Sequence, residues 1–330
     1  MTSYKNFGVV GGGAWGTALA QLLAADGAPI RLWARETEVV AGINIEHRNM
    51  LFLPGAALSP SLTATTDLAD LSACDALLIV VPVPYMRAVL ADLPPGAAPL
   101  ILCSKGMEAG SFAFPVDIAR DVTPSRPVAV LSGPTFAHEV AAGLPTAITL
   151  AAEDPVLADA LAQAIARPHF RPYVSGDVTG AEIGGAVKNI LAIASGIVDG
   201  AGLGLNARAA LISRGFAEMT RFGLARGAET ETLAGLAGLG DLILTCTSSN
   251  SRNFALGQGL GRGEDAATLM ADRRTVAEGA FSAPVVAAAA RADGIDMPIT
   301  DAVARLVAGE IRAAEAIQAL LSRPLRREGR

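Results

Sequence analysis

Short apolar runs recur through the first half of the chain. They lack the alternation of apolar and polar residues that marks a strand with one face in water, so each predicts a strand covered on both faces. The runs are NFGVV (6–10), PIRLWAR (29–35), DALLIVVP (75–82), PLILCSK (99–105), PVAVLSGP (127–134) and TAITLAA (146–152). Helical patterns lie between them, including PYMRAVLADL (84–93) and DPVLADALAQAIA (154–166). This alternation predicts an α/β domain with a doubly wound parallel sheet.

The pattern changes near Asp177. From there the strand-like runs disappear, and long Ala, Leu and Ile segments with a period near 3.6 residues predict helices. A chain of 330 residues is also long for one hydrophobic core. We therefore expect two domains, the α/β domain in residues 1–180 and an all-helical C-terminal domain in residues 181–330. The abundance of Ala and Gly predicts that the helices pack through small side chains.

The charge balance and the apolar runs exclude several classes of protein. The net charge is −6 with a pI near 5.2, and the basic terminal run RPLRREGR (323–330) is typical of a solvated end, so we expect no nucleic-acid partner. The most apolar run, ALLIVVPVP (76–84), is far shorter than the ~20 residues of a membrane helix. The start MTSYKNFGVV lacks the pattern of a signal peptide. We expect a cytoplasmic protein without membrane insertion.

Cysteine and histidine usage agrees with that expectation. The three cysteines have no paired spacing and are typical of reduced thiols. The three histidines, His47, His138 and His169, are isolated and not at ligand spacing, so we expect no metal site. Their isolation also argues against a dehydrogenase with a histidine base.

The first apolar run leads into a glycine-rich segment, GVVGGGAWGTALA (8–20), in the order G-x-G-x-x-G. A predicted strand precedes it and a predicted helix follows. In that context Gly11 permits a tight turn, Gly13 lets the backbone approach a pyrophosphate, and Gly16 lets the helix pack on the strand. The helix N-terminus then faces the phosphates with unpaired N–H groups. The segment predicts the dinucleotide site of a Rossmann-type domain; a glycine-rich turn without a ligand is the alternative.

The end of the second predicted strand bears on the choice of cofactor. Rossmann proteins that prefer NAD usually carry Asp or Glu there. Here LWAR (32–35) puts Arg35 at or beside that position, followed by Glu36. Because a guanidinium suits a 2′-phosphate, we expect NADP(H) to be favoured without excluding NAD(H). The alternative is an arginine paired in solvent with Glu36 or Glu38.

The helical half opens with TGAEIGGAVKNILAIASGIVDG (179–200). On a helix, the apolar face toward the core is Ile183, Val187, Ile190, Leu191, Ala194 and Val198. Another face carries Lys188 among small residues, namely Ala181, Gly184, Ala192 and Ser195. Small neighbours leave room for a ligand, and burial would lower the pKa of Lys188 from its ordinary value of ~10.4 toward the acid–base range. The alternative is a snorkelling or salt-bridged lysine.

Two further clusters strengthen the functional interpretation of Lys188. GLAGLGDLILTC (235–246) puts Asp241 in a glycine-rich turn ahead of an apolar run. SSNSRNFALG (248–257) sets Ser251, Arg252 and Asn253 side by side, at a predicted helix start. An arginine with hydroxyl, amide and helix-terminal N–H donors suits a phosphomonoester. Taken singly, Asp241 could be a helix cap and the SRN segment a solvated turn.

Motifs along the whole chain resemble those of bacterial NAD(P)-dependent sn-glycerol-3-phosphate dehydrogenases. The matching segments are GGGAWGTALA, LWAR, SKGME, LSGPTFAHEV, AVKNILAIASGI, GLNARAALISRGFAEM, LAGLGDLILTCTSSNSRNFALG and VAEG. They follow the family's order and spacing, whereas generic Rossmann dehydrogenases share only the first. The chain departs from the commonest pattern at Ala14 and Thr135, where many members have serine.

The resemblance implies a role for each matching residue. Lys188 would be the proton donor and acceptor at the substrate C2 oxygen, Lys105 would lie near cofactor and substrate, and Asp241 would hold Lys188 and the substrate hydroxyls. The implied cofactor contacts are Gly11, Gly13, Ala14, Trp15, Gly16, Arg35, Lys105, Ala137, Arg252, Val276 and Glu278. The implied substrate contacts are Lys105, Gly133, Thr135, Lys188, Asn189, Asp241, Ser251, Arg252 and Asn253.

The resemblance also implies the reaction. A hydride passes from NAD(P)H to dihydroxyacetone phosphate, and Lys188 protonates the developing oxyanion to give sn-glycerol 3-phosphate for phospholipid synthesis. We expect a homodimer. Two alternatives stay open. A β-hydroxyacid dehydrogenase also has a helix lysine, but its Asn follows four residues later, where this chain has Ala192. A non-catalytic NADP-sensing protein would lack the second site.

Overall fold

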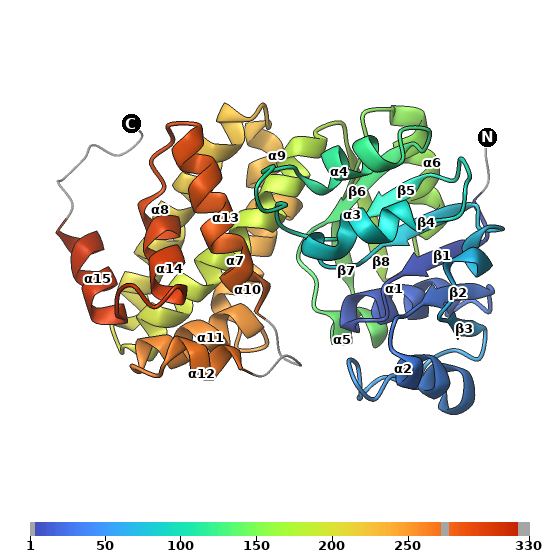
Figure 1. Ribbon diagram of the computed structural model, residues 1–330, viewed down its shortest axis with the longest axis horizontal. Coiled ribbons are helices and arrows are strands. Elements are labelled where there is room, and N and C mark those ends of the chain that lie inside the picture. Colours follow the sequence, from blue (N-terminus) through green and yellow to red (C-terminus); the bar gives the residue numbers. More distant parts are fainter. Residues whose placement is uncertain (1–3, 272–276, 323–330) are drawn as a thin grey trace. The chain divides into compact units, whose positions relative to one another are not determined.

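The structure is a computed structural model that describes residues 4–271 and 277–322 (Figure 1). It divides into two compact units. The first runs to Gly185 and includes Gly227–Asp241, and the second comprises Ala186–Arg226 and the residues from Leu242 onward. The boundary predicted after residue 180 lies shortly before Gly185, where the chain first passes from the first unit to the second. The segment 227–241 returns to the first unit, which no local pattern indicated.

The first unit is built on an eight-stranded sheet in the order β3-β2-β1-β4-β5-β6-β7-β8. The strands are β1 (Phe7–Val10), β2 (Ile30–Trp33), β3 (Leu62–Thr65), β4 (Ala76–Ile79), β5 (Leu100–Leu102), β6 (Val128–Ser132), β7 (Thr146–Ala151) and β8 (Phe170–Ser175). Neighbours are parallel from β3 to β6, and β7 pairs with β8 in parallel. The predicted α/β fold, with a doubly wound sheet and a helical C-terminal region, is confirmed, and the sheet is parallel except at one strand pair.

One strand runs against the prediction of a wholly parallel sheet. β7 pairs with β6 in the antiparallel sense. The connection between them contains only the five-residue helix α5 (Ala137–Ala141). A parallel crossover usually carries a helix long enough to cover the sheet, which the five-residue α5 is not, so this connection favours reversal of the chain.

The two edge strands, β3 and β8, were not predicted from the apolar runs. Buried and more exposed positions alternate in β3, and β8 is mostly exposed or half-buried. An edge strand has water on one side, so its residues need not form a continuous apolar run.

Helices cover both faces of this sheet. On one face, α1 (Ala14–Ala24) and α6 (Pro155–Ile165) pack over residues such as Val9 and Leu78. On the other, α3 (Val83–Ala91) and α4 (Pro115–Val122) pack over residues such as Val10 and Ile79. Adjacent residues of one strand therefore point into two different cores, which explains the unbroken apolar runs.

Short elements complete the first unit. They are α2 (Thr37–Ala41), η1 (Gly42–Glu46), η2 (Leu68–Leu71), α9 (Thr230–Ala234) and the π-helical segment η3 (Leu236–Gly240).

The described part of the second unit is helical, as predicted. Its helices are α7 (Val178–Gly200, which begins in the first unit), α8 (Gly204–Ala225), α10 (Asp241–Thr247, whose first residue belongs to the first unit), α11 (Arg252–Gly261), α12 (Ala266–Met270), α13 (Glu278–Ala292), α14 (Pro298–Val307) and α15 (Ala313–Leu321). α7 and α11 touch backbone to backbone. A Cβ on Gly196 would lie 2.1 Å from the Phe254 carbonyl oxygen, and one on Gly257 would lie 2.1 Å from that of Ile193. Packing through small residues is confirmed here.

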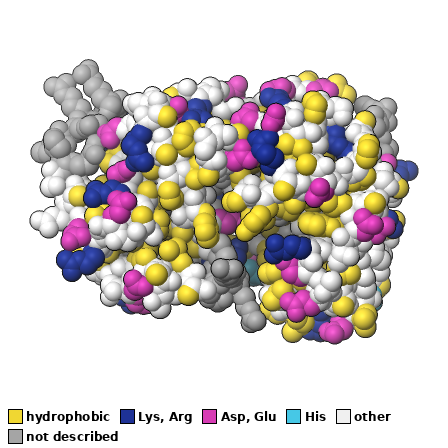
Figure 2. All heavy atoms as spheres, viewed as in Figure 1, with side chains coloured by type: hydrophobic (Ala, Val, Ile, Leu, Met, Phe, Trp, Pro, Cys, Tyr) yellow, Lys and Arg dark blue, Asp and Glu magenta, His cyan; other side chains and the backbone are white. Residues whose placement is uncertain are grey.

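α7 is long and apolar enough to cross a membrane by length and composition alone. Its most apolar window is wholly buried inside the protein, as expected for the central helix of a globular core. The surface carries charges of both signs. Figure 2 shows Lys and Arg side chains interspersed with Asp and Glu over the face in view.

Candidate active site

The glycine-rich loop joins β1 to α1, and each of its three motif glycines has a distinct environment. Gly11 has φ +128°, and a Cβ there would lie 2.7 Å from the Val80 carbonyl oxygen. A Cβ on Gly16 would lie 1.9 Å from the Gly11 carbonyl oxygen, whereas one on Gly13 would meet nothing within 4 Å. The loop is therefore closed on the protein side and open at Gly13, as the approach of a pyrophosphate requires.

The start of α1 has the chemistry of an anion site. Its N-cap is Gly13, which has no side chain to bond the first N–H groups. Ala14 and Trp15 follow as the first helical residues, and both also pack partly against the core. Because these N–H groups and the helix dipole favour a negative charge, the residues present fit a dinucleotide.

Arg35 follows β2, whose carboxyl end lies beside the glycine loop. β1 and β2 are parallel with Val10 opposite Trp33, and the Gly11 N–H donates to the Trp33 carbonyl oxygen at 3.0 Å. The Arg35 side chain is 76% exposed and pairs with Glu36 at 3.0 Å. The solvent pair considered as the alternative is therefore present, and an exposed pair of this kind is weak enough to exchange for a ligand phosphate.

Lys105 is held by an ion pair inside the first unit. It stands three residues after β5, and its Nζ lies 2.6 Å from Oδ2 of Asp241, the residue that follows η3. The Asp241 side chain is fully buried and that of Lys105 is 15% exposed. Sequence patterns identified both residues but not their pairing.

The β6–α5 loop adds small groups to the same edge of the sheet. Gly133 has φ +156°, Thr135 donates to the Gly133 carbonyl oxygen at 3.4 Å, and Ala137 begins α5. Sequence reasoning missed Ser132, whose hydroxyl is buried and has no hydrogen-bond partner in the described residues. Because β1, β2, β5 and β6 are mutually parallel, their carboxyl ends share the edge where ligands of such sheets bind.

In the second unit, Lys188 lies within α7 and is buried at 6% exposure. Its Nζ donates to the Thr245 hydroxyl at 3.1 Å, and Thr245 is also buried. Sequence reasoning missed Thr245. The available signal was its place four residues after Asp241 on α10, which puts the two on one helix face.

The small-residue face around Lys188 is only partly open to a ligand. A Cβ on Gly184 would lie 2.1 Å from the carbonyl oxygen of Ala237 in η3. The expectation that small residues leave ligand room is thus wrong at Gly184, where the protein's own backbone makes the close approach.

The SRN segment starts α11, as predicted. Ser251 is the N-cap, and its hydroxyl accepts the Phe254 N–H at 3.2 Å. Arg252 is the first helical residue and is exposed. The Asn253 amide donates to Asn189 Oδ1 at 3.0 Å and accepts the Gly279 N–H at 2.8 Å.

Glu278 extends this polar chain, because its Oε2 accepts the Asn189 amide at 3.4 Å. Asn189, Asn253 and Glu278 are therefore brought together in the second unit. Val276 lies outside the described residues. Across residues 4–271 and 277–322, no group of three or more His, Cys, Asp or Glu side chains could hold a metal ion.

Comparisons with known proteins identify both halves of the chain. Residues 6–158 match the family model for the NAD-dependent glycerol-3-phosphate dehydrogenase N-terminus, and residues 177–318 match that for the C-terminus. A Sphingopyxis alaskensis protein named as an NAD(P)+ glycerol-3-phosphate dehydrogenase is 84% identical over 329 residues, with 100% of both chains covered. One from Erythrobacter litoralis is 60% identical over 97% of both chains. The crystal structure of the Coxiella burnetii enzyme has a TM-score of 0.92 at 39% identity and covers 97% of this chain and 99% of its own.

Proposed function

The chain belongs to the NAD-dependent glycerol-3-phosphate dehydrogenase family, and from that premise we propose how its residues carry out the reaction. The enzyme reduces dihydroxyacetone phosphate to glycerol 3-phosphate with NAD(P)H. When bound, the nicotinamide cofactor supplies the hydride. The observation that carries our assignment is the buried Lys188, which donates to the Thr245 hydroxyl.

Lys188 acts as the general acid in this proposal. Reduction of a ketone places negative charge on the C2 oxygen, and a fixed ammonium group stabilises that oxygen and delivers its proton. The Thr245 hydroxyl orients the lysine Nζ. Lys105, whose ammonium is held by Asp241, assists at cofactor and substrate.

The phosphate of the substrate binds at the start of α11. Arg252 supplies an exposed guanidinium and the helix supplies its N-terminal N–H groups. Asn189 and Asn253 stiffen this region through their mutual hydrogen bond, and the Ser251 hydroxyl caps the helix. Phosphate binding far from C2 then positions the reacting carbonyl, so its energy contributes to the rate.

The dinucleotide binds over the glycine loop, with Ala137, Val276 and Glu278 as further cofactor contacts, whereas Gly133 and Thr135 contact the substrate. We propose that NADP(H) is preferred, because Arg35 is free to exchange Glu36 for a 2′-phosphate. NAD(H) is also used, since Glu36 stands next to Arg35 and can accept a ribose hydroxyl.

We also propose that the enzyme is a cytoplasmic homodimer. Cys74, Cys103 and Cys246 are free thiols, which is typical of a reducing compartment. Light scattering during gel filtration tests the oligomeric state, and a monomer at micromolar concentration would contradict it.

The deciding experiment follows NADPH oxidation by the purified protein with dihydroxyacetone phosphate, repeated with NADH and with 2-methyl-3-oxopropanoate. We expect turnover with the phosphorylated ketone alone. Turnover with the carboxylate substrate would instead favour a β-hydroxyacid dehydrogenase. Cofactor binding without any turnover would favour an NADP-sensing protein.

A further inference from the structure

Lys105 stands on the connection between β5 and α4, a loop of residues 103–114 that needs support from outside itself. Gly106 has φ +123°, and Phe112, a residue with a bulky side chain, has φ +57°. A left-handed conformation at a residue such as Phe112 is unfavourable by ~1 kcal/mol or more. Two backbone bonds close the loop, from Glu108 N–H to the Ala113 carbonyl oxygen at 2.9 Å and from Phe112 N–H to that of Glu108 at 3.0 Å.

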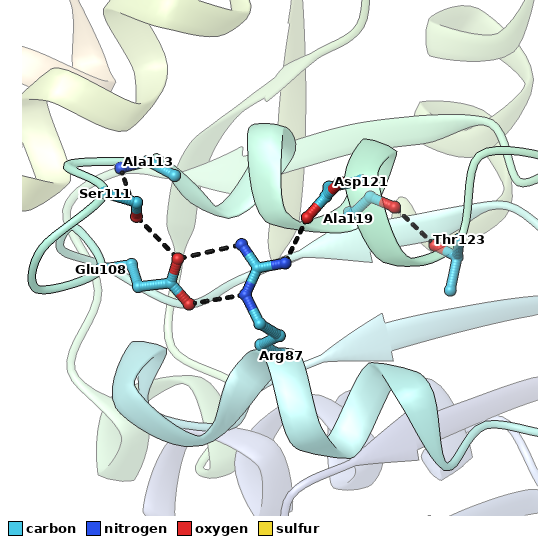
Figure 3. A network of polar contacts seen from close by, with 7 residues as sticks. All are labelled: Arg87, Glu108, Ser111, Ala113, Ala119, Asp121 and Thr123. Atoms are coloured by element: carbon cyan, nitrogen blue, oxygen red, sulfur yellow. Dashed lines mark hydrogen bonds and ion pairs between the residues drawn. The ribbon is translucent and has the colours of Figure 1, made fainter.

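The side chain of Glu108, three residues after Lys105, is the meeting point of this loop with the rest of the unit (Figure 3). Arg87 of α3 donates to both of its oxygens, Nε to Oε1 and Nη2 to Oε2, each at 2.9 Å. The Ser111 hydroxyl donates to Oε2 at 2.7 Å, and its own oxygen accepts the Ala113 N–H at 3.2 Å. A two-point contact fixes the direction of the carboxylate as well as its distance.

Arg87 is itself fixed by a third group. Its Nη1 pairs with Asp121 of α4, so one guanidinium joins α3, the loop and α4. The Arg87 guanidinium and the Ser111 hydroxyl hold the pKa of Glu108 below its usual range, which keeps its carboxylate charged at neutral pH. The Glu108 side chain is 19% exposed, compared with 68% for Asp121, so the pair with Glu108 is the better shielded contact.

We propose that Arg87 is a positioning residue for Lys105. Its two-point contact with Glu108 sets the path of the 103–114 loop and thereby holds the Lys105 ammonium against Asp241. The expected effect on activity rests on the proposed role of Lys105, but the placement of its amine does not. Activity and amine placement are therefore measured separately.

Amine labelling followed by mass spectrometry measures how accessible the Lys105 amine is. Each lysine can be followed separately, because the chain has only three, Lys5, Lys105 and Lys188. Lys5 is exposed and serves as the internal reference, and the buried Lys188 of the second unit reports any general loosening. The variants are Arg87→Lys, Glu108→Gln and the double variant. Lysine keeps the charge of Arg87 but loses the planar two-point contact. Glu153→Gln is the control, since it breaks another Arg–carboxylate pair of the same unit, with Arg120 of α4.

We expect Arg87→Lys and Glu108→Gln each to raise Lys105 labelling relative to Lys5 by roughly threefold or more, with Lys188 labelling unchanged. The double variant should match the larger single effect, because each substitution removes the same Arg87–Glu108 contact. kcat with dihydroxyacetone phosphate should fall by ~10-fold, since a small misplacement of a catalytic group is costly. Unchanged Lys105 labelling, additive effects, equal effects of Glu153→Gln or parallel exposure of Lys188 would each overturn the proposal. Absence of turnover by the unaltered enzyme would instead refute the proposed function, and the labelling result would still stand.

Discussion

Lys188 and Lys105 are both largely buried, but the chain supports them in different ways. Lys188 lies inside the 23-residue helix α7, where the helix backbone fixes its direction. Lys105 lies on a loop with three residues of positive φ, Gly106, Gly110 and Phe112. Its place depends on Asp241 and on contacts made by other residues of the loop.

This difference shows where a catalytic group is sensitive to remote change. A side chain on a helix inherits its geometry from local backbone hydrogen bonds, so few distant residues can move it. A side chain on a loop takes its geometry from the groups that anchor the loop at each end. The placement of Lys188 should therefore change little when distant residues are mutated. The placement of Lys105 should change also when residues that do not touch it are mutated.

The largest effect is expected from removing the helix-borne lysine. Lys188→Ala should reduce kcat for dihydroxyacetone phosphate by at least ~10²-fold, the usual contribution of a general acid. Because Lys188 lies outside the glycine loop, binding of NADPH, measured by its fluorescence, should stay intact. A rate near that of the unaltered enzyme would refute the assignment of Lys188.

Arg252 extends the comparison to a second helix-borne group. Arg252→Ala should raise KM for dihydroxyacetone phosphate by roughly 10-fold or more, because a hydrogen bond between charged groups contributes ~1.5–3 kcal/mol. The effect on kcat should be smaller than that of Lys188→Ala. Steady-state kinetics over a range of ketone concentrations checks this, and an unchanged KM would move the phosphate site elsewhere.

Glu182 holds the chain just beyond the far end of the loop that carries Lys105. Its Oε1 accepts the Val116 N–H at 2.9 Å in the first turn of α4, and burial raises its pKa to about 8. Asp117 also raises this pKa, whereas the Val116 N–H and Arg120 lower it. Since the folded protein binds this proton more tightly than the unfolded chain, stability should fall as pH rises from about 4.5 to about 8.

Glu182→Gln should remove this part of the pH dependence, because an amide does not titrate. The Tm difference between Glu182→Gln and the unaltered protein should therefore change across pH 5–9. The change should be roughly a few degrees for each kcal/mol of stability that the unaltered protein loses as Glu182 ionises. Glu218→Gln is the matched control in the second unit. Its carboxylate accepts the Ile299 and Thr300 N–H groups of α14, and burial raises its pKa to about 7. The pH range over which its ionisation lowers stability should therefore end at a lower pH than for Glu182. Parallel Tm curves for Glu182→Gln and the unaltered protein would contradict the prediction.

The smallest effect is expected at Arg35, an exposed group on the turn after β2. Arg35→Ala should shift the ratio of kcat/KM for NADPH and NADH toward NADH by roughly fivefold, the scale of an exposed ion pair. Glu36→Gln provides the complementary change, with an expected shift toward NADPH. An unchanged ratio in Arg35→Ala would show that Arg35 does not select the cofactor.

Much of the fold could be predicted from the sequence, but not at its edges. Six strands were found because parallel strands covered on both faces leave continuous apolar runs. β3 and β8 were missed because an edge strand need not be apolar throughout, and the direction of β7 depended on a short connection. The helix start at Arg252 was predicted correctly because Ser251 is a strong N-cap residue.

The sequence by itself determined the features that depend on neighbouring residues: the glycine loop, the two lysines and their segments, and the residues that start α11. The tertiary structure decided which of these groups meet. Lys105 and Asp241 are 136 residues apart, Lys188 and Thr245 are 57 apart, and Arg87 of α3 reaches Glu108 on the loop after β5. Local patterns record backbone preference and burial, whereas such pairings follow from the packing of distant segments.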